Sequence, residues 1–234
     1  ETSYALASGA VFLYVKLYLD NIDGRLARAR NEVSRFGRFF DSFADWIVTV
    51  LVYAAIAIRL VRETGDLSLG LLGAAAALSG FIHCSFYVFY LVHYASLAGT
   101  YENNRPDESF TSEDNSAYRQ GEFSRSVYFL QRFHGWAYGW QDRLIAGLDR
   151  FSRKLAGSTN AQSERAWYGD KRFLTLASPL CLCTNNMAVV VFSIFNRLDI
   201  GLALIVGLGN LYWVGLSAWK IARFKLAGKD RVKK

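Results

Sequence analysis

Four aspartates near one end of the sequence have the residue type and the spacing of a metal site. Asp20 and Asp23 are three residues apart and Asp41 and Asp45 are four apart, so each pair shares one face of a helix. The 17 residues between Asp23 and Asp41 leave room for a helix end, a turn and a returning helix, so the two faces can converge. Four carboxylates at such a site repel one another unless cations join them. Oxygen donors without a nearby His or Cys favour two Mg²⁺ or Mn²⁺ ions, which would balance the four charges.

These aspartates are part of a longer pattern with eight fixed positions in 26 residues. The pattern is Asp20-x2-Asp23-Gly24-x2-Ala27-Arg28-x8-Gly37-x3-Asp41-x3-Asp45. It resembles the signature of the CDP-alcohol phosphotransferases, also called CDP-alcohol phosphatidyltransferases, and every fixed position matches at the expected spacing. Because eight positions agree, four solvated aspartates at helix ends are a poor alternative.

The resemblance implies a reaction and assigns roles to these residues. A CDP-linked alcohol, often CDP-diacylglycerol, would meet a second alcohol whose hydroxyl attacks the β-phosphorus, so that CMP leaves. The implied metal ligands are Asp20, Asp23, Asp41 and Asp45, with Asp45 also resembling the general base. The implied CDP-alcohol contacts are Asp20, Asp23, Gly24, Ala27, Arg28, Gly37 and Asp41, where small residues allow close approach and the arginine can pair with a phosphate.

Five further residues are weaker candidates for acceptor or phosphate contacts. Lys16 lies one helical turn before Asp20 and can instead be a structural ion pair. Arg35 can instead belong to the ordinary basic excess of a cytoplasmic surface. Asn185 and Asn186 lie in an apolar stretch, where an interhelical hydrogen bond is an equal alternative. His93 is the next candidate for the base if Asp45 is only a metal ligand.

The elements that must position these residues are predicted to be membrane helices. Apolar residues make up 52% of the 234 residues, and five stretches are nearly free of charge. About 20 apolar residues span a bilayer as a helix. We therefore predict an all-α polytopic membrane bundle, which excludes a soluble domain, a disordered chain and a disulfide scaffold. The predicted helices are Ser3–Arg28, Phe39–Arg62, Leu67–Leu97, Phe173–Phe195 and Ile200–Phe224.

The orientation of the bundle follows from its basic residues. Of 27 Lys and Arg, 23 fall on the side that carries the first interhelical link, residues 102–172 and the C-terminal tail. Such an excess marks the cytoplasmic face, so the aspartates are expected there, in the inner membrane if the cell is bacterial or archaeal. The family core has six spans, so the resemblance predicts that this chain lacks the first.

The long polar stretch between the third and fourth predicted helices is expected to be cytoplasmic. Residues 101–120 are predicted to be a loop, with little periodicity. An apolar stripe then recurs every three or four residues, which predicts a helix lying on the membrane surface. A helix packed on the ends of the spans or on a second subunit is the alternative, and Gly135 and Gly139 are expected to break it in two. The stripe is Val127, Leu130, Phe133, Trp136, Trp140, Leu144, Leu148, Phe151 and Leu155. The resulting division is 1–100 with the signature, 101–172, 173–226 and a basic tail at 227–234.

Other function classes and partners are weighed on the same grounds. The net charge of +7 is explained by the cytoplasmic basic excess, so no nucleic acid is expected. Cys84, Cys181 and Cys183 lack metal spacing and are expected to be small buried hydrophobes.

Two rival function classes make demands that this sequence does not meet. A Mg²⁺-dependent membrane prenyltransferase would need a second Asp-rich motif, and a transporter would need polar residues along several spans. The expected partners are CDP-diacylglycerol or another CDP-alcohol, a small polar or phosphorylated alcohol, the lipid bilayer and a possible second copy; the acceptor stays open.

Overall fold

The computed structural model describes residues 2–30, 34–99, 110–158 and 160–232, and these residues form helices without a β-strand among them. Five helices in this part of the chain are long and apolar enough to cross a membrane, which confirms the predicted all-α polytopic bundle. They are Tyr4–Ala27, Arg35–Thr64, Leu67–Leu97, Lys171–Ile194 and Leu198–Leu226. The chain is a multi-pass membrane protein.

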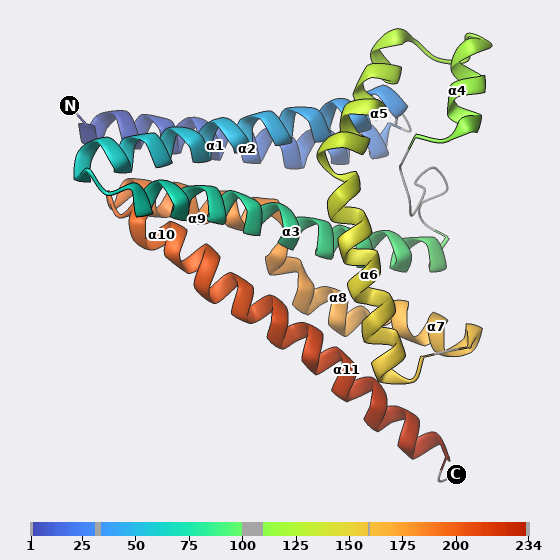
Figure 1. The fold of residues 1–234 in the computed structure, drawn as a ribbon. Coiled ribbons are helices and arrows are strands. Elements are labelled where there is room, and N and C mark those ends of the chain that lie inside the picture. The colour runs from blue at the N-terminus through green and yellow to red at the C-terminus, as the bar shows by residue number, and fades with distance from the viewer. Residues whose placement is uncertain (1, 31–33, 100–109, 159, 233–234) are drawn as a thin grey trace.

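The first three helices and the later helix α9 run side by side, as Figure 1 shows. They are α1 (Thr2–Ala29), α2 (Arg35–Thr64), α3 (Leu67–Leu97) and α9 (Leu182–Ile194). A tight turn joins α2 to α3: Gly65 takes a left-handed conformation with φ 73°, and the Asp66 side chain accepts from the Ser68 amide at 2.8 Å. This turn makes α2 and α3 antiparallel neighbours, as the short link predicts.

Helix α2 begins four residues earlier than predicted. The Ser34 hydroxyl caps it by accepting a hydrogen bond from the Gly37 amide at 3.0 Å. Arg35 and Gly37 therefore belong to the first turn of α2, although the sequence placed them in the link before Phe39. The charged first turn hid this start, because the prediction followed the apolar stretch alone.

The fourth predicted helix is interrupted. It consists of α8 (Lys171–Ala177), the 3₁₀ turn η1 (Ser178–Leu180) and α9. Pro179 lies in η1, and Cys181 after it is extended with ψ 155°, so the backbone changes direction before α9 begins. Proline removes a helical donor and clashes with the preceding turn, which explains the break.

The last span is one helix with a π turn inside it. It is made of α10 (Leu198–Leu204), the π turn η2 (Ile205–Gly209) and α11 (Asn210–Val232). After the turn, the Asn210 side chain hydrogen-bonds His83 and Ser79 of α3, each at 3.0 Å. α11 continues to Val232, beyond the predicted end at Phe224.

The described residues between α3 and α8, 110–158 and 160–170, form four helices. They are α4 (Ser112–Arg119), α5 (Arg125–Ala137), α6 (Gly139–Ala156) and α7 (Ala161–Tyr168). The predicted loop at 101–120 is wrong for its second half, because Thr111 and Asp114 form a capping box that starts α4; residues 100–109 lie outside the described residues. The predicted break of the amphipathic helix is confirmed, and it falls at Tyr138.

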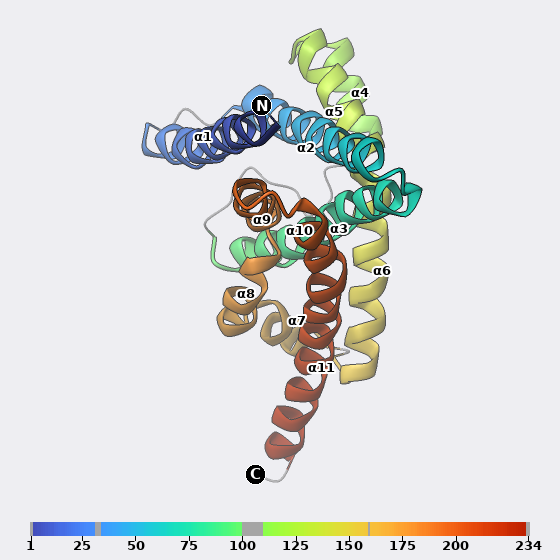
Figure 2. The ribbon, with the colours of Figure 1, turned by 90° about the vertical axis from the view of Figure 1, so that its left-hand side faces the viewer.

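Helices α5 and α6 run across the direction of α1, α2 and α3 (Figure 1), and α6 runs alongside α11 (Figure 2). α5 packs on α2, and α6 packs on α3 and α11. Only the start of the predicted stripe faces the protein, since Val127 and Leu130 are buried. On α6 the buried positions include Gln141 and Asp149, whereas the later stripe residues are exposed. The exposed stripe is Trp136, Trp140, Leu144, Leu148, Phe151 and Leu155.

The buried apolar residues form two clusters that share α3. The first joins α1, α2, α3, α9 and α10 around Tyr53, Ala76 and Leu202. The second joins α3, α6, α7, α8 and α11 around Phe86, Trp167 and Phe173. The helices that carry the signature, α1 and α2, therefore contribute to the first cluster, and the inserted helices α6 and α7 contribute to the second.

Candidate metal and nucleotide site

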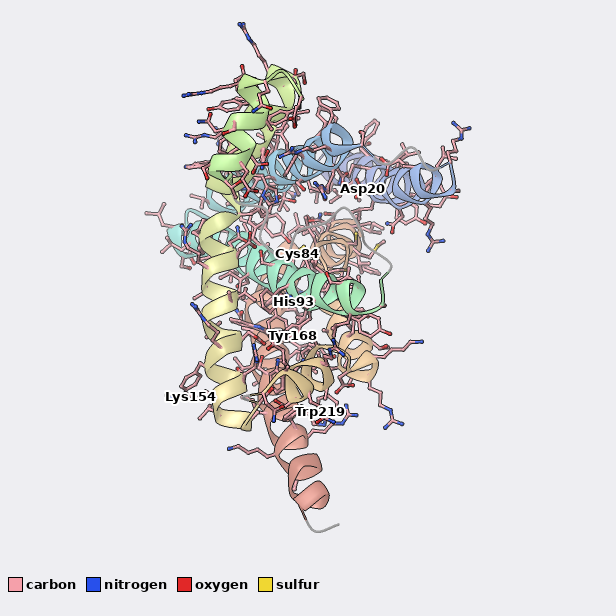
Figure 3. All side chains as sticks on the ribbon, turned by 90° about the vertical axis from the view of Figure 1, so that its right-hand side faces the viewer. Asp20, Cys84, His93, Lys154, Tyr168 and Trp219 are labelled. Atoms are coloured by element: carbon pink, nitrogen blue, oxygen red, sulfur yellow. The ribbon has the colours of Figure 1, made fainter. Side chains whose placement is uncertain are left out.

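Three aspartates from two antiparallel helices converge at one end of the bundle. Asp20 comes from the last third of α1, while Asp41 and Asp45 lie one turn apart near the start of α2. Each can offer a carboxylate oxygen such that the three atoms all lie within 4.8 Å of one another. Figure 3 shows Asp20 at the end of the molecule that faces the viewer. The convergence predicted from the spacing of the aspartates is thus observed for three of the four.

Lys16 is the cation that directly contacts this cluster among the described side chains. Its ammonium forms an ion pair with Asp45 and lies 3.2 Å from Asp20 Oδ1. The position one turn before Asp20 explains the second contact, but the contact to α2 was not predicted. Lys16 and Asp45 are each about one-quarter exposed, so the pair is neither fully solvated nor sealed from substrate.

The rest of the signature surrounds the cluster. Asp23 is exposed one turn beyond Asp20, and its charge reaches both Asp41 and Asp45. Gly24 and Ala27 are half-buried on the same helix end. Arg28 lies in the last turn of α1, but its side chain lies outside the described part of the chain. The described signature residues therefore lie near the end of α1 and the start of α2, around the three clustered carboxylates.

Gly37 has a local reason to lack a side chain. A Cβ built there would lie 3.1 Å from the Ser34 hydroxyl that caps α2. A contact this short would push on the cap, and the Gly37 amide is the group that the cap satisfies. A side chain would thus disturb the start of the helix that carries Asp41 and Asp45.

The donor chemistry of the cluster fits a hard divalent cation. The three atoms that can converge are all carboxylate oxygens, which Mg²⁺ and Mn²⁺ prefer. Three negative charges meet one ammonium there, so cations are needed to neutralise the remainder. The residues present therefore fit the metal that the signature implies.

Some buried polar atoms of α2 and α9 have no hydrogen-bond partner among the described residues, and they lie about one helical turn deeper in the bundle than the aspartates. Thr49 follows Asp45 by four residues and is 1% exposed, and its hydroxyl is unpaired. Asn185 and Asn186 on α9 are 7% and 2% exposed, and each has an unpaired amide atom. Tyr53, the next turn of α2, packs in one cluster with Val189 and Val190, the next turn of α9. Thr49 and the two asparagines therefore lie at the same depth, beneath the aspartates.

The cysteines are closer to this site than the sequence suggested. All three are free and half-buried, so they are less buried than the small buried hydrophobes that the sequence predicts. Cys84 on α3 and Cys183 on α9 lie close enough for the charge of Asp45 to reach them. Cys181 contacts the Thr184 hydroxyl at 3.3 Å where α9 begins. The break at Pro179 is what brings this end of α9 beside α1.

Two predicted site residues have other partners. His93 bonds the Phe89 carbonyl through Nδ1 at 2.8 Å and stacks on Tyr168 at 4.3 Å, away from Asp20 in Figure 3. Arg35 lies in the first turn of α2, but its guanidinium contacts Asp114 and Gln131 of the inserted segment. The structure therefore does not place His93 beside Asp45, and it gives Arg35 protein partners.

Comparison with known proteins supports the identity of this site. Residues 2–101 match the family model of the CDP-alcohol phosphatidyltransferases. The match includes α1, α2, α3 and every position of the signature, which confirms the predicted family. It ends before α4, so the inserted helices and the last two spans lie outside it. No curated protein and no solved structure matches the chain.

Proposed function

We propose that this CDP-alcohol phosphatidyltransferase domain moves a phosphoalcohol group, specifically a phosphatidyl group, from a CDP-alcohol to an acceptor alcohol in phospholipid synthesis. The observation that carries the proposal is the convergence of Asp20, Asp41 and Asp45 within the family signature. CDP-diacylglycerol is the proposed donor, because its acyl chains suit a site at the end of a membrane bundle. CMP is the leaving group.

The chain's own residues would divide the work between holding the donor and moving a proton. Asp20, Asp23, Asp41 and Asp45 would hold two Mg²⁺ or Mn²⁺ ions, which would neutralise charge on the donor's diphosphate. Asp45 would accept the proton of the acceptor hydroxyl as its oxygen attacks the β-phosphorus and the bond to CMP breaks. The general-base role suits Asp45 because it lies deeper than Asp41.

The small and basic residues of the signature would shape the donor site. Gly24, Ala27 and Gly37 leave room for the nucleotide between the ends of α1 and α2. Arg28 would pair with a phosphate. Lys16 already contacts Asp45 and Asp20, so it would turn to a phosphate once metal ions replace its ammonium at these carboxylates.

The acceptor would enter beside Asp45, where the unpaired groups lie. Among the described residues, Thr49 Oγ1, Asn185 Nδ2 and Asn186 Oδ1 are buried without a hydrogen-bond partner. Leaving such groups unpaired costs about 1–3 kcal/mol each, so hydroxyls of a bound polar alcohol would stabilise them. We propose these residues as acceptor contacts, and Arg35 and His93 less so because protein partners occupy them.

The site is proposed to face the cytoplasm, with the exposed stripe of α6 against the bilayer. The basic excess on this side supports that orientation, and lipid would cover Trp140, Leu144 and Leu148 better than water would. A cysteine placed at Ser112, in a variant without the native cysteines, should resist a membrane-impermeant thiol reagent in intact cells. Rapid labelling would place Ser112 outside the cell and would contradict this orientation.

A second copy of the chain packed against the exposed stripe of α6 is the alternative to lipid.

The test of the proposed function is direct product analysis. Purified full-length protein would be incubated with CDP-diacylglycerol, Mg²⁺ and separate acceptors: inositol, inositol phosphate, glycerol phosphate, serine or a second lipid. Mass spectrometry should detect CMP and one new phosphodiester, and the Asp41→Asn variant should form neither. Absence of CMP release with every acceptor and with other CDP-alcohols would contradict the proposal.

A further inference from the structure

The inserted helices α4 and α5, which the family match does not cover, hydrogen-bond to the end of α2 that carries the signature. Arg35, in the first turn of α2, donates from Nη2 to Asp114 Oδ1 at 2.6 Å and to Gln131 Oε1 at 2.7 Å. Asp114 belongs to α4 and is 2% exposed; Gln131 belongs to α5 and is 1% exposed. Gln131 also donates to Asp114 Oδ2 at 3.1 Å, so the three side chains form one closed network.

The acceptor in this network is itself fixed in place. Asp114 Oδ2 accepts from both the amide and the hydroxyl of Thr111 at 3.0 Å. The Asp114 amide in turn donates to the Thr111 hydroxyl at 3.3 Å, which completes the capping box of α4. The Arg35 guanidinium also lies over the Phe123 ring, 4.6 Å from its centroid. A buried carboxylate with this many donors is rigid, so it can hold the arginine of another element at a defined position.

A second set of contacts continues along α2 toward the aspartates. Phe39 is buried against the His134 ring at 5.5 Å, and the Tyr138 hydroxyl donates to the Ser42 carbonyl at 2.9 Å. Burial, with the nearby Arg38 charge, lowers the pKa of His134 to about 4, so this ring is neutral and packs as an aromatic at neutral pH. Trp46 packs on Phe133 at 5.3 Å.

These contacts occupy one side of α2 and leave the aspartates on another. Arg35, Phe39, Ser42 and Trp46 follow at intervals of four, three and four, the spacing of one helix face. Asp41 and Asp45 lie roughly 110° around the helix from that face, at 100° per residue. The inserted segment can thus hold this end of α2 without covering the metal site.

We propose that Asp114 and Gln131 are positioning residues, which act through Arg35 to hold the first turns of α2 where Asp41 and Asp45 meet Asp20. Helix ends fray, and Asp41 is only six residues from the first residue of α2. Three carboxylates that repel one another would also drive α1 and α2 apart before cations bind. A fixed anchor at Arg35 opposes both effects. The inference rests on the proposed function only for the identity of the bound metal.

The test compares metal affinity in purified full-length variants. Mn²⁺ binding is measured from the loss of the free-ion EPR signal, and turnover with CDP-diacylglycerol is measured in parallel. Asp114→Asn should weaken Mn²⁺ binding by roughly 10–100-fold, the range typical of residues that support metal ligands. The matched control is Glu164→Gln, which breaks the Arg153–Glu164 pair at 3.0 Å between α6 and α7 and should leave Mn²⁺ affinity unchanged.

Two further variants keep the test decisive. If Asp114→Asn does not fold, Gln131→Leu removes one hydrogen bond to Arg35 and should show the same shift in smaller measure. If Arg35 and Asp114 act through each other, Asp114→Asn with Arg35→Met should bind Mn²⁺ no worse than Asp114→Asn alone. Folded variants with wild-type Mn²⁺ affinity would overturn the inference. Failure of the proposed function would instead appear as wild-type protein that binds Mn²⁺ but releases no CMP.

Discussion

Asp149 on α6 and the cluster of Asp20, Asp41 and Asp45 on α1 and α2 both place carboxylates among the helices, but the partners of these carboxylates differ. Asp149 is 3% exposed and accepts hydrogen bonds from the Tyr90 hydroxyl at 2.7 Å, Trp167 Nε1 at 2.9 Å and the Tyr168 hydroxyl at 2.6 Å. Lys220 lies near enough for the two charges to interact, and its ammonium donates to the Trp167 carbonyl at 3.1 Å. The protein itself satisfies this carboxylate.

Among the residues that the structure describes, no comparable set of donors surrounds Asp20, Asp41 and Asp45. Three carboxylates share one small volume, and Lys16 is their direct partner among the side chains that the structure describes. The difference separates a structural carboxylate from one that awaits a ligand. Where the chain supplies three donors from two other helices, the carboxylate holds helices together; where it gathers like charges, the site is completed by cations.

Of the changes predicted here, removal of divalent metal should lower activity most. It should act through the aspartate cluster and leave the hydrogen bonds of Asp149 intact. Excess EDTA should abolish CMP release, because the single ammonium of Lys16 cannot neutralise the four signature carboxylates. Activity is measured before and after chelation, and added Mg²⁺ should restore it. Full turnover in excess EDTA would remove the basis of the comparison.

Asp45→Asn should lower the rate by about 10²–10⁴-fold, the usual contribution of a general base. Binding of CDP-diacylglycerol should be largely retained, because Asp20, Asp23 and Asp41 remain. Asp23→Asn should lower both rate and binding, since a lost ligand weakens metal and nucleotide together. The measurement is donor affinity beside initial rate for the two variants. Equal loss of binding in both would make Asp45 mainly a metal ligand.

Asp149→Leu should destabilise the fold and leave the metal site intact. Three buried donors would lose their acceptor, and breaking such a buried charged network costs about 3–5 kcal/mol. Thermal unfolding in detergent should therefore occur at a lower temperature, while the folded protein binds Mn²⁺ with unchanged affinity. Weakened Mn²⁺ binding would show that the two carboxylate groups are coupled and are not independent.

Asp41→Asn should have the opposite effect on stability when no metal is bound. Removing one of three clustered negative charges relieves repulsion, so the midpoint of thermal unfolding in EDTA should rise by about 2–4 °C, as expected for about 1 kcal/mol in a chain of this size. The same variant should lose Mg²⁺-dependent activity. A lower midpoint in EDTA would mean that Asp41 is stabilised by protein donors, like Asp149.

Lys16→Met should give the smallest change. The ammonium competes with metal ions for Asp45 and Asp20, so its removal should lower the Mg²⁺ concentration for half-maximal activity by roughly two- to tenfold, given the screening at a partly exposed site. Titration of activity with Mg²⁺ measures this. An increase in the Mg²⁺ requirement would indicate that Lys16 chiefly helps to hold the donor's phosphates beside the metal.

The sequence predicts the elements and contacts that depend on local spacing. Charge-free stretches locate the five spans, and intervals of three and four residues bring Asp20 to Asp41 and Asp45. Pro179 and the capping residues Thr111 and Asp114 were also visible, although the apolar pattern and the polar loop composition outweighed them.

Other contacts depend on how distant segments pack, and spacing along the chain does not report that. The Arg35–Asp114 pair joins residues 79 positions apart. The sequence predicts that the apolar stripe of α6 faces a membrane or a protein surface. It does not predict that the buried side of α6 carries Gln141 and Asp149, because their hydrogen-bond partners lie on other helices. In lipid, the polar side of such a helix turns inward.

The π turn at 205–209 has a consequence for how the two apolar clusters are joined. Before it, Leu198 and Leu202 belong to the apolar cluster that includes α1 and α2; after it, Leu216 belongs to the cluster that includes α6 and α7. One residue more than an α turn rotates everything that follows by about 100°. A deletion of one residue here would keep both halves helical but put them out of phase, so that only one cluster could be filled. Segment length at this point sets the rotational register between the catalytic and inserted halves.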